Sequence, residues 1–116
     1  MASYNKIQLS GATDGRSISV DSTASTAGTA IHTAGSTSQI DEVWLWATNT
    51  GSASKKITVQ FGGVTDPDDL VEFYVPPEDG PYLLIPGWTL TNSLAIKAYA
   101  ETADLINING YVNRIA

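Results

Sequence analysis

The chain has 116 residues, with six basic and twelve acidic side chains, one histidine and no cysteine. This length suits one domain and leaves no room for separate cofactor and substrate domains. The net charge of −6 would repel a phosphate backbone, and no apolar run approaches the ~20 residues of a membrane span. We therefore expect one domain over residues 1–116, with no cofactor, no disulfide or thiolate metal site, and no nucleic-acid or membrane partner.

Short runs of alternating apolar and polar residues recur along the chain between turn residues, and this pattern predicts β-strands. In the first third the runs are 4–9, 16–20 and 29–33. Residues 21–39 have Ile31 as their only large apolar side chain. The segment 1–39 is therefore expected either to join the domain or to form in part an extended arm.

The runs 40–49 and 55–61 are separated by a glycine-containing segment of five residues and predict a β-hairpin. Further strands are expected at 70–75, 82–85, 93–101 and 105–114, with turns that include Pro76-Pro77 and Pro86-Gly87. Asn109-Gly110 suits either a tight hairpin turn or a glycine bulge within one strand. These eight or nine strands predict an all-β, two-sheet antiparallel β-sandwich that is jelly-roll-like. The shared phase of the strands predicts ten core side chains: Ile57, Val59, Phe61, Val71, Phe73, Val75, Leu94, Ile96, Ile106 and Ile108.

Few polar residues are candidates for catalysis or metal binding. A hydrolase would need His32 beside a nucleophile such as Ser36 or Ser38, but no nucleophile elbow is present, so we expect a half-exposed strand histidine. Five acids gather near two turns, but they lack the spacing of an EF-hand and suit ordinary turn chemistry: Asp66, Asp68, Asp69, Glu78 and Asp79. We expect no catalytic and no metal-binding residues.

Aromatic residues are stronger candidates for a binding surface or interface. Within 43–47, Val43 and Leu45 share one face of the strand while Trp44 and Trp46 occupy the other, so this strand is apolar on both sides. One face must therefore meet something beyond an ordinary core, either another subunit, another part of the chain or a ligand. The candidate interface or binding residues are Trp44, Trp46, Trp88 and Tyr74. Packing or a subunit interface is favoured over stacking on a sugar.

Several blocks resemble small virion proteins of tailed bacteriophages: Ile40 to Thr50, Ile57 to Gly63, Asp66 to Asp69, Val75 to Tyr82, Ile85 to Gly87 and Ile106 to Ile115. The resemblance covers about residues 40–116 and includes no catalytic motif.

The resemblance implies a non-enzymatic structural protein of the virion, assembled in the host cytoplasm. The role that it favours is a capsid decoration or cement protein, which binds the major capsid protein or another virion protein and stabilises the assembled head. It also implies a homo-oligomer, with a trimer favoured. The alternative is a carbohydrate-binding β-sandwich of a tail or fibre, which would use the exposed tryptophans as stacking platforms.

Overall fold

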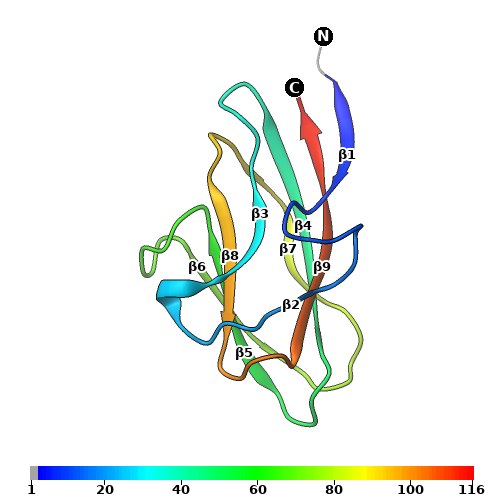
Figure 1. Ribbon diagram of the computed structural model, residues 1–116, viewed down its shortest axis with the longest axis vertical. Coiled ribbons are helices and arrows are strands. Elements are labelled where there is room, and N and C mark those ends of the chain that lie inside the picture. Colours follow the sequence, from blue (N-terminus) through cyan, green and yellow to red (C-terminus); the bar gives the residue numbers. More distant parts are fainter. Residues whose placement is uncertain (1–2) are drawn as a thin grey trace.

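The computed structural model describes residues 3–116, and its strands wind around one core (Figure 1). Nine strands and one short 3₁₀ helix follow in chain order: β1 (Tyr4–Gln8), β2 (Ile18–Ser19), η1 (Ser25–Ala27), β3 (Thr29–Thr33), β4 (Ile40–Asn49), β5 (Lys55–Phe61), β6 (Leu70–Val75), β7 (Tyr82–Leu90), β8 (Ala95–Ala100) and β9 (Ile106–Ile115). The alternation in the sequence placed eight of these nine strands to within a few residues. The exception is β7, which is longer than the predicted strand 82–85.

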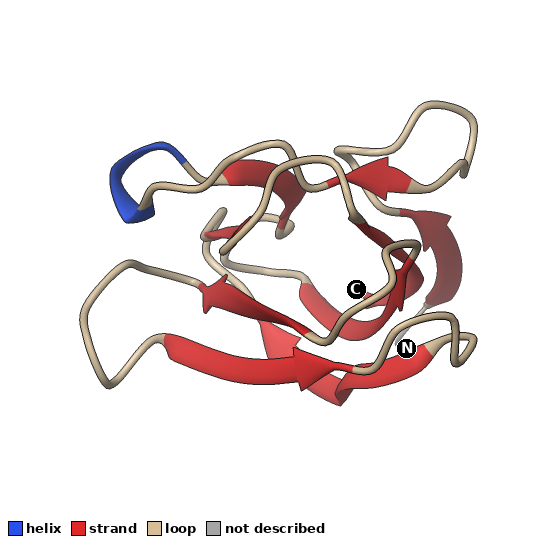
Figure 2. Ribbon diagram, turned by 90° about the horizontal axis from the view of Figure 1, so that it is seen from below, coloured by secondary structure: helices blue, strands red, loops and turns tan. Residues whose placement is uncertain are grey.

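The strands form two antiparallel sheets, which Figure 2 shows as two layers viewed from below. The five-stranded sheet has the order β1-β9-β4-β7, with the short β2 also paired to β9, and the four-stranded sheet has the order β3-β8-β5-β6. The pairs are nested along the chain, because β5 pairs with β6, β4 with β7, β3 with β8 and β1 with β9. This nesting is one long antiparallel ribbon wound into two sheets, so the predicted jelly-roll-like β-sandwich is confirmed.

The core lies between the sheets and consists of the inward-facing alternate residues of both. Of the ten predicted core side chains, six are buried: Ile57, Val59, Val75, Ile96, Ile106 and Ile108. Phe61, Val71 and Phe73 are partly buried and pack against these residues. Leu94 is wrong: it is 42% exposed, because it follows a turn in which Asn92 and Ser93 have positive φ and precedes the first residue of β8.

The predicted hairpin of 40–49 with 55–61 is also wrong. β4 belongs to the five-stranded sheet and β5 to the four-stranded sheet, so residues 50–54 carry the chain from one layer to the other. Asn49 supports this corner, because its side-chain amide donates to the carbonyl oxygens of Ala53 and Val75, at 2.9 Å each. Alternation of apolar and polar residues is the same whether two consecutive strands pair in one sheet or lie in different sheets. The sequence pattern therefore could not distinguish the two arrangements.

Two predicted turns are continuous strand. Pro86 and Gly87 lie inside β7, where the register against β4 shifts between Val43 and Trp44 and again between Leu45 and Trp46. Proline is tolerated here because β7 is an edge strand, and Gly87 has a φ of +80°, which glycine adopts readily. Asn109-Gly110 forms neither the hairpin turn nor the bulge, since β9 pairs with β4 in unbroken register through both residues.

Residues 3–39 belong to the sandwich rather than to a free arm. β1 and β2 pair with β9, and β3 pairs with β8. Between β2 and β3 the segment containing η1 covers part of the outer face of the four-stranded sheet. There the Gln60 amide donates to the Ser25 carbonyl oxygen at 2.9 Å, and Gln60 is almost wholly buried.

Candidate functional site

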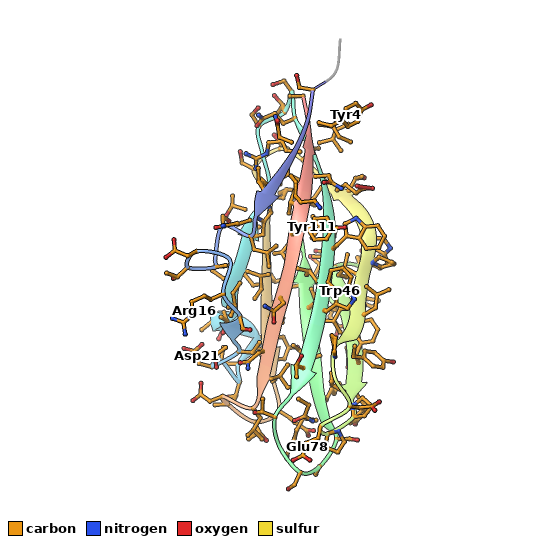
Figure 3. The ribbon with its side chains drawn as sticks, turned by 90° about the vertical axis from the view of Figure 1, so that its right-hand side faces the viewer. Tyr4, Arg16, Asp21, Trp46, Glu78 and Tyr111 are labelled. Carbon is orange, nitrogen blue, oxygen red and sulfur yellow. The ribbon has the colours of Figure 1, made fainter. Side chains whose placement is uncertain are left out.

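The candidate site is the outer face of the five-stranded sheet, called here the aromatic face. Trp44 and Trp46 of β4 and Tyr111 of β9 point outward and stack on one another, with ring centroids 6.1 to 6.5 Å apart. Figure 3 shows Trp46 and Tyr111 on neighbouring strands of this face. Val43, Leu45 and Ala47 point inward and are fully buried, which confirms that β4 is apolar on both sides.

Backbone register and a glycine hold these rings in place. Trp44 lies directly opposite Tyr111 in the β4–β9 pair. On the other side of β4, the Trp44 ring lies over Gly87 so closely that a Cβ added there would be 2.8 Å from a ring carbon. Covering an edge glycine with an aromatic ring stabilises a sheet and fixes the ring against the backbone. The aromatic face is therefore a preformed surface.

On β1, β4, β7 and β9 the register assigns sixteen outward-facing residues to the aromatic face: Tyr4, Lys6 and Gln8 of β1; Ile40, Glu42, Trp44, Trp46 and Thr48 of β4; Leu83, Pro86 and Thr89 of β7; and Asn107, Asn109, Tyr111, Asn113 and Ile115 of β9. Half of them are apolar or aromatic. Tyr4, Ile40 and Leu83 are 73%, 46% and 43% exposed, so they extend the aromatic patch along and across the sheet.

Only two of these sixteen side chains are charged, and both are engaged within the face. The Lys6 ammonium lies 4.7 Å from the centroid of the Tyr111 ring, a cation–π contact. Glu42 accepts a hydrogen bond of 2.8 Å from the Asn113 amide. Depletion of charge together with enrichment in tryptophan and tyrosine is the composition of the central part of a protein interface.

The structure separates the four residues that the sequence analysis grouped. Trp44 and Trp46 lie together on the aromatic face. Trp88 lies at the β7 edge of the sandwich, edge-on to Phe61 at 5.6 Å. Tyr74 is 66% exposed on the outer face of the opposite sheet. Trp88 and Tyr74 therefore form no common surface with the stacked pair.

The sequence analysis did not include Tyr111 and Lys6 among the candidate site residues. The phase of the last strand indicates that Tyr111 shares a face with Asn109 and Asn113, but nothing local pairs it with Trp44, 67 positions earlier in the chain. That pairing comes from the return of β9 to the centre of the sheet, which only the nested topology supplies.

His32 is not the half-exposed residue that was expected, because it is 2% exposed within a polar cluster between the two sheets. Its Nδ1 accepts the Ser10 backbone N–H at 3.0 Å, so Nε2 carries the proton and donates to Asp41 Oδ2 at 2.7 Å. Both ring nitrogens are therefore engaged. Ser36 and Ser38, the suggested nucleophiles, are exposed and hydrogen-bond each other.

Asp41 is the centre of this cluster and is fully buried. It accepts hydrogen bonds from Arg114 Nε at 2.8 Å, Arg114 Nη2 at 2.9 Å, His32 Nε2 at 2.7 Å and the Gly35 N–H at 3.2 Å. Burial acts to raise the pKa of Asp41, but the hydrogen bonds and charge of Arg114, together with the bond from His32, outweigh burial and lower that pKa. The cluster ties β3 of one sheet to β4 and β9 of the other, which is a structural role.

Two hollows on the described surface are small, and the first of them borders the aromatic face. An apolar one of about 260 Å³ is lined by Ile40, Thr89, Leu90, Thr91 and Leu94. A polar one of about 180 Å³ lies on the four-stranded sheet around Thr58, Glu72 and Tyr99. Pockets that bind drug-sized ligands usually exceed ~300 Å³.

Among residues 3–116, no three histidine or carboxylate side chains are placed to hold a metal ion. Within the same residues, no helix has the length and apolar character needed to cross a membrane.

Comparison with known proteins finds no matching family model, no matching curated protein and no matching solved structure.

Proposed function

We propose that this chain is a non-enzymatic structural protein of a tailed-phage virion, and that it decorates and stabilises the assembled capsid. The observation that carries the proposal is the aromatic face: a preformed, nearly uncharged surface of stacked rings suited to association with protein. The resemblance of residues 40–116 to small virion proteins supplies the biological setting. The partner is the major capsid protein or another virion protein, and the location is the virion.

The polar groups support a binding role over a catalytic one. A general acid or base must reach the proton that it transfers. His32 is buried, and its two ring nitrogens are occupied by the Ser10 backbone and by Asp41. Asp69, one of the clustered acids, accepts the Thr65 N–H at 3.0 Å, as an acid does when it stabilises its own loop.

Charge and size also suit a decoration protein. A net charge of −6 disfavours contact with packaged DNA and suits a protein on the outside of a capsid. A small β-sandwich can occupy many equivalent lattice positions, and weak single contacts then become durable through effective concentration. We propose that the protein binds the capsid as a homo-oligomer.

A carbohydrate-binding module is the second candidate, and one observation favours it. Asn109 lies opposite Trp46, and Asn113 lies opposite Glu42 beside the rings, so amide groups border the aromatic patch. Sugar sites combine such amides with aromatic platforms. Against this, Trp44 and Trp46 are both partly buried, which leaves less of each ring free to stack on a sugar.

The deciding experiment adds purified protein to capsids assembled without it. We expect the protein to co-sediment with these capsids and to raise the temperature at which they break open. Glycan-array binding is measured in parallel with the wild type and with Trp44→Ala. The proposal fails if the protein neither binds nor protects capsids, and glycan binding that Trp44→Ala removes would establish the carbohydrate alternative.

A further inference from the structure

We propose that the aromatic face is covered by the same face of a second copy of this chain, so that two five-stranded sheets pack against each other about a two-fold axis. This inference rests on the aromatic face that carries the proposed function, and it names a second copy of the chain as what covers that face in solution. On a capsid, the virion protein would take the place of the second copy. Four features of the face carry it: area, charge, composition and register.

The area is close to what a stable pair needs. β4 and β9 have 10 residues each, β7 has 9 and β1 has 5. At strand spacings of about 4.8 Å and a rise of about 3.3 Å per residue, these strands cover roughly 550 Å² in projection. Side chains standing above the sheet raise the accessible area further, toward the ~800 Å² per partner of a standard interface.

Charge favours a second copy over a basic partner. The chain carries a net charge of −6, so two copies repel unless the contact avoids the acidic residues. Lys6 and Glu42 give the outward-facing residues of this face a net charge of zero. In Figure 3 the labelled charged residues Arg16, Asp21 and Glu78 lie at the margins, away from Trp46 and Tyr111. A basic partner would instead bind the acidic residues outside this face.

The composition explains why the face needs a cover. The stacked tryptophans and the exposed Tyr4, Ile40 and Leu83 give this face a run of apolar side chains of the kind that marks an interaction site. Homodimer interfaces are the class with the most apolar composition, and two-fold pairs are the commonest closed oligomers.

The register makes the face complementary to itself. Trp44 and Tyr111 are direct neighbours across the β4–β9 pair, and so are Glu42 and Asn113. A two-fold axis running along the strands between β4 and β9 exchanges the two strands. It therefore places Trp44 of one copy over Tyr111 of the other, and Glu42 over Asn113. Sheets packed face to face lie ≈ 10 Å apart with strands about 30° from parallel, which leaves room for interleaved rings.

The first test measures mass by light scattering and by sedimentation equilibrium over a range of micromolar concentrations. We expect twice the chain mass of 12.3 kDa. Trp46→Arg places a charge in the centre of the face and should raise the dissociation constant about thirtyfold or more, as expected for an aromatic anchor. The matched control is Tyr74→Arg, an aromatic-to-arginine change at a 66% exposed position on the opposite sheet, which should leave the mass unchanged.

A second measurement does not depend on disrupting the pair. Because the chain has no cysteine, Asn109→Cys and Tyr74→Cys each introduce a single thiol, one on the aromatic face and one on the opposite sheet. We expect the reaction of the thiol at position 109 with a bulky maleimide to slow as protein concentration rises through the association range. The thiol at position 74 should react at a constant rate, and circular dichroism confirms that each variant is folded.

Each outcome decides the inference. A wild type that stays at the mass of one chain overturns it, and so does an assembly of three chains, because a closed face-to-face contact joins two. Equal reactivity of both thiols at all concentrations also overturns it. If a chain that stays single in solution binds and protects capsids, the second copy is refuted while the proposed function stands.

Discussion

Replacing Asp41 with asparagine should destabilise the protein more than any other isosteric change at an acidic residue. The carboxylate accepts four hydrogen bonds from Arg114, His32 and the Gly35 backbone, and it is fully buried. An asparagine has one acceptor oxygen and a donor amide, so at least one of its ends would face the N–H groups of Arg114 or His32. Because the cluster joins the two sheets, losing these hydrogen bonds should weaken the packing of one sheet on the other.

The magnitude follows from the exposure of the partners. Removing one member of a buried ion pair usually costs 3–5 kcal/mol, since the remaining charge stays buried without compensation. The Arg114 side chain is 26% exposed and can partly regain water, whereas the His32 side chain is 1% exposed and cannot. We therefore expect a loss of about 2–4 kcal/mol in the free energy of unfolding. For a domain of this size that lowers the Tm by roughly 8–16 °C.

Urea unfolding at neutral pH, followed by tryptophan fluorescence, measures this free energy. The matched control is Asp68→Asn, the same chemical change at an exposed loop position, which should alter stability by less than ~0.5 kcal/mol. If Asp41→Asn and Asp68→Asn destabilise equally, or if Asp41→Asn costs less than about 1 kcal/mol, the reasoning from the buried cluster is refuted.

Three further predictions concern pH, glycine positions and the role of His32. The pKa of Asp41 is lower in the folded chain than in the unfolded chain, where it is about 3.8. The stabilisation by this carboxylate is therefore complete above the unfolded pKa and is lost as the pH falls through the folded pKa. The difference in unfolding free energy between the wild type and Asp41→Asn should be smaller in urea titrations at pH 3 than at pH 7. Gly110→Ala should prevent native pairing of β4 with β9, because its Cβ would overlap the Trp44 carbonyl oxygen. In Gly80→Ala the added Cβ meets nothing within 4 Å, so this variant should lose only about 1 kcal/mol of stability for its positive φ. Thermal unfolding of both variants measures the difference. His32→Ala should lower the Tm but leave capsid binding intact below that Tm, and a folded His32→Ala protein that cannot bind would contradict the structural role of this residue.

The strands could be predicted because their information is local. Alternation within 40–49 or 55–61 shows which residues point inward regardless of the neighbouring strand, and eight of the nine strands were placed to within a few residues. Layer membership is not local. The five residues 50–54 can join two strands in one sheet or cross between sheets. Asn49, whose buried side chain holds the corner, looks in the sequence like an ordinary last residue of a strand.

The candidate site was predictable only in part, for the same reason. The two-sided apolar character of β4 is visible within 43–47, so Trp44 and Trp46 were found. Tyr111 joins them through the return of β9. His32 was misjudged because it depends on Arg114, 82 positions away, through Asp41. The polar and small residues around His32 in the sequence suggest that it is exposed. Its burial can be inferred only when Asp41 and Arg114 are known to contact it.

The nested pairing of the strands implies an order in which the ribbon can form. β5 and β6 are separated by 8 residues, whereas β1 and β9 stand almost the whole chain apart. Closing a loop costs more entropy as it lengthens, and each inner pair shortens the effective loop that the next pair must close. The ribbon should therefore form outward from β5 and β6. The short strands β1 and β2, each paired with β9 alone, should show the fastest hydrogen exchange among the strands of the sandwich.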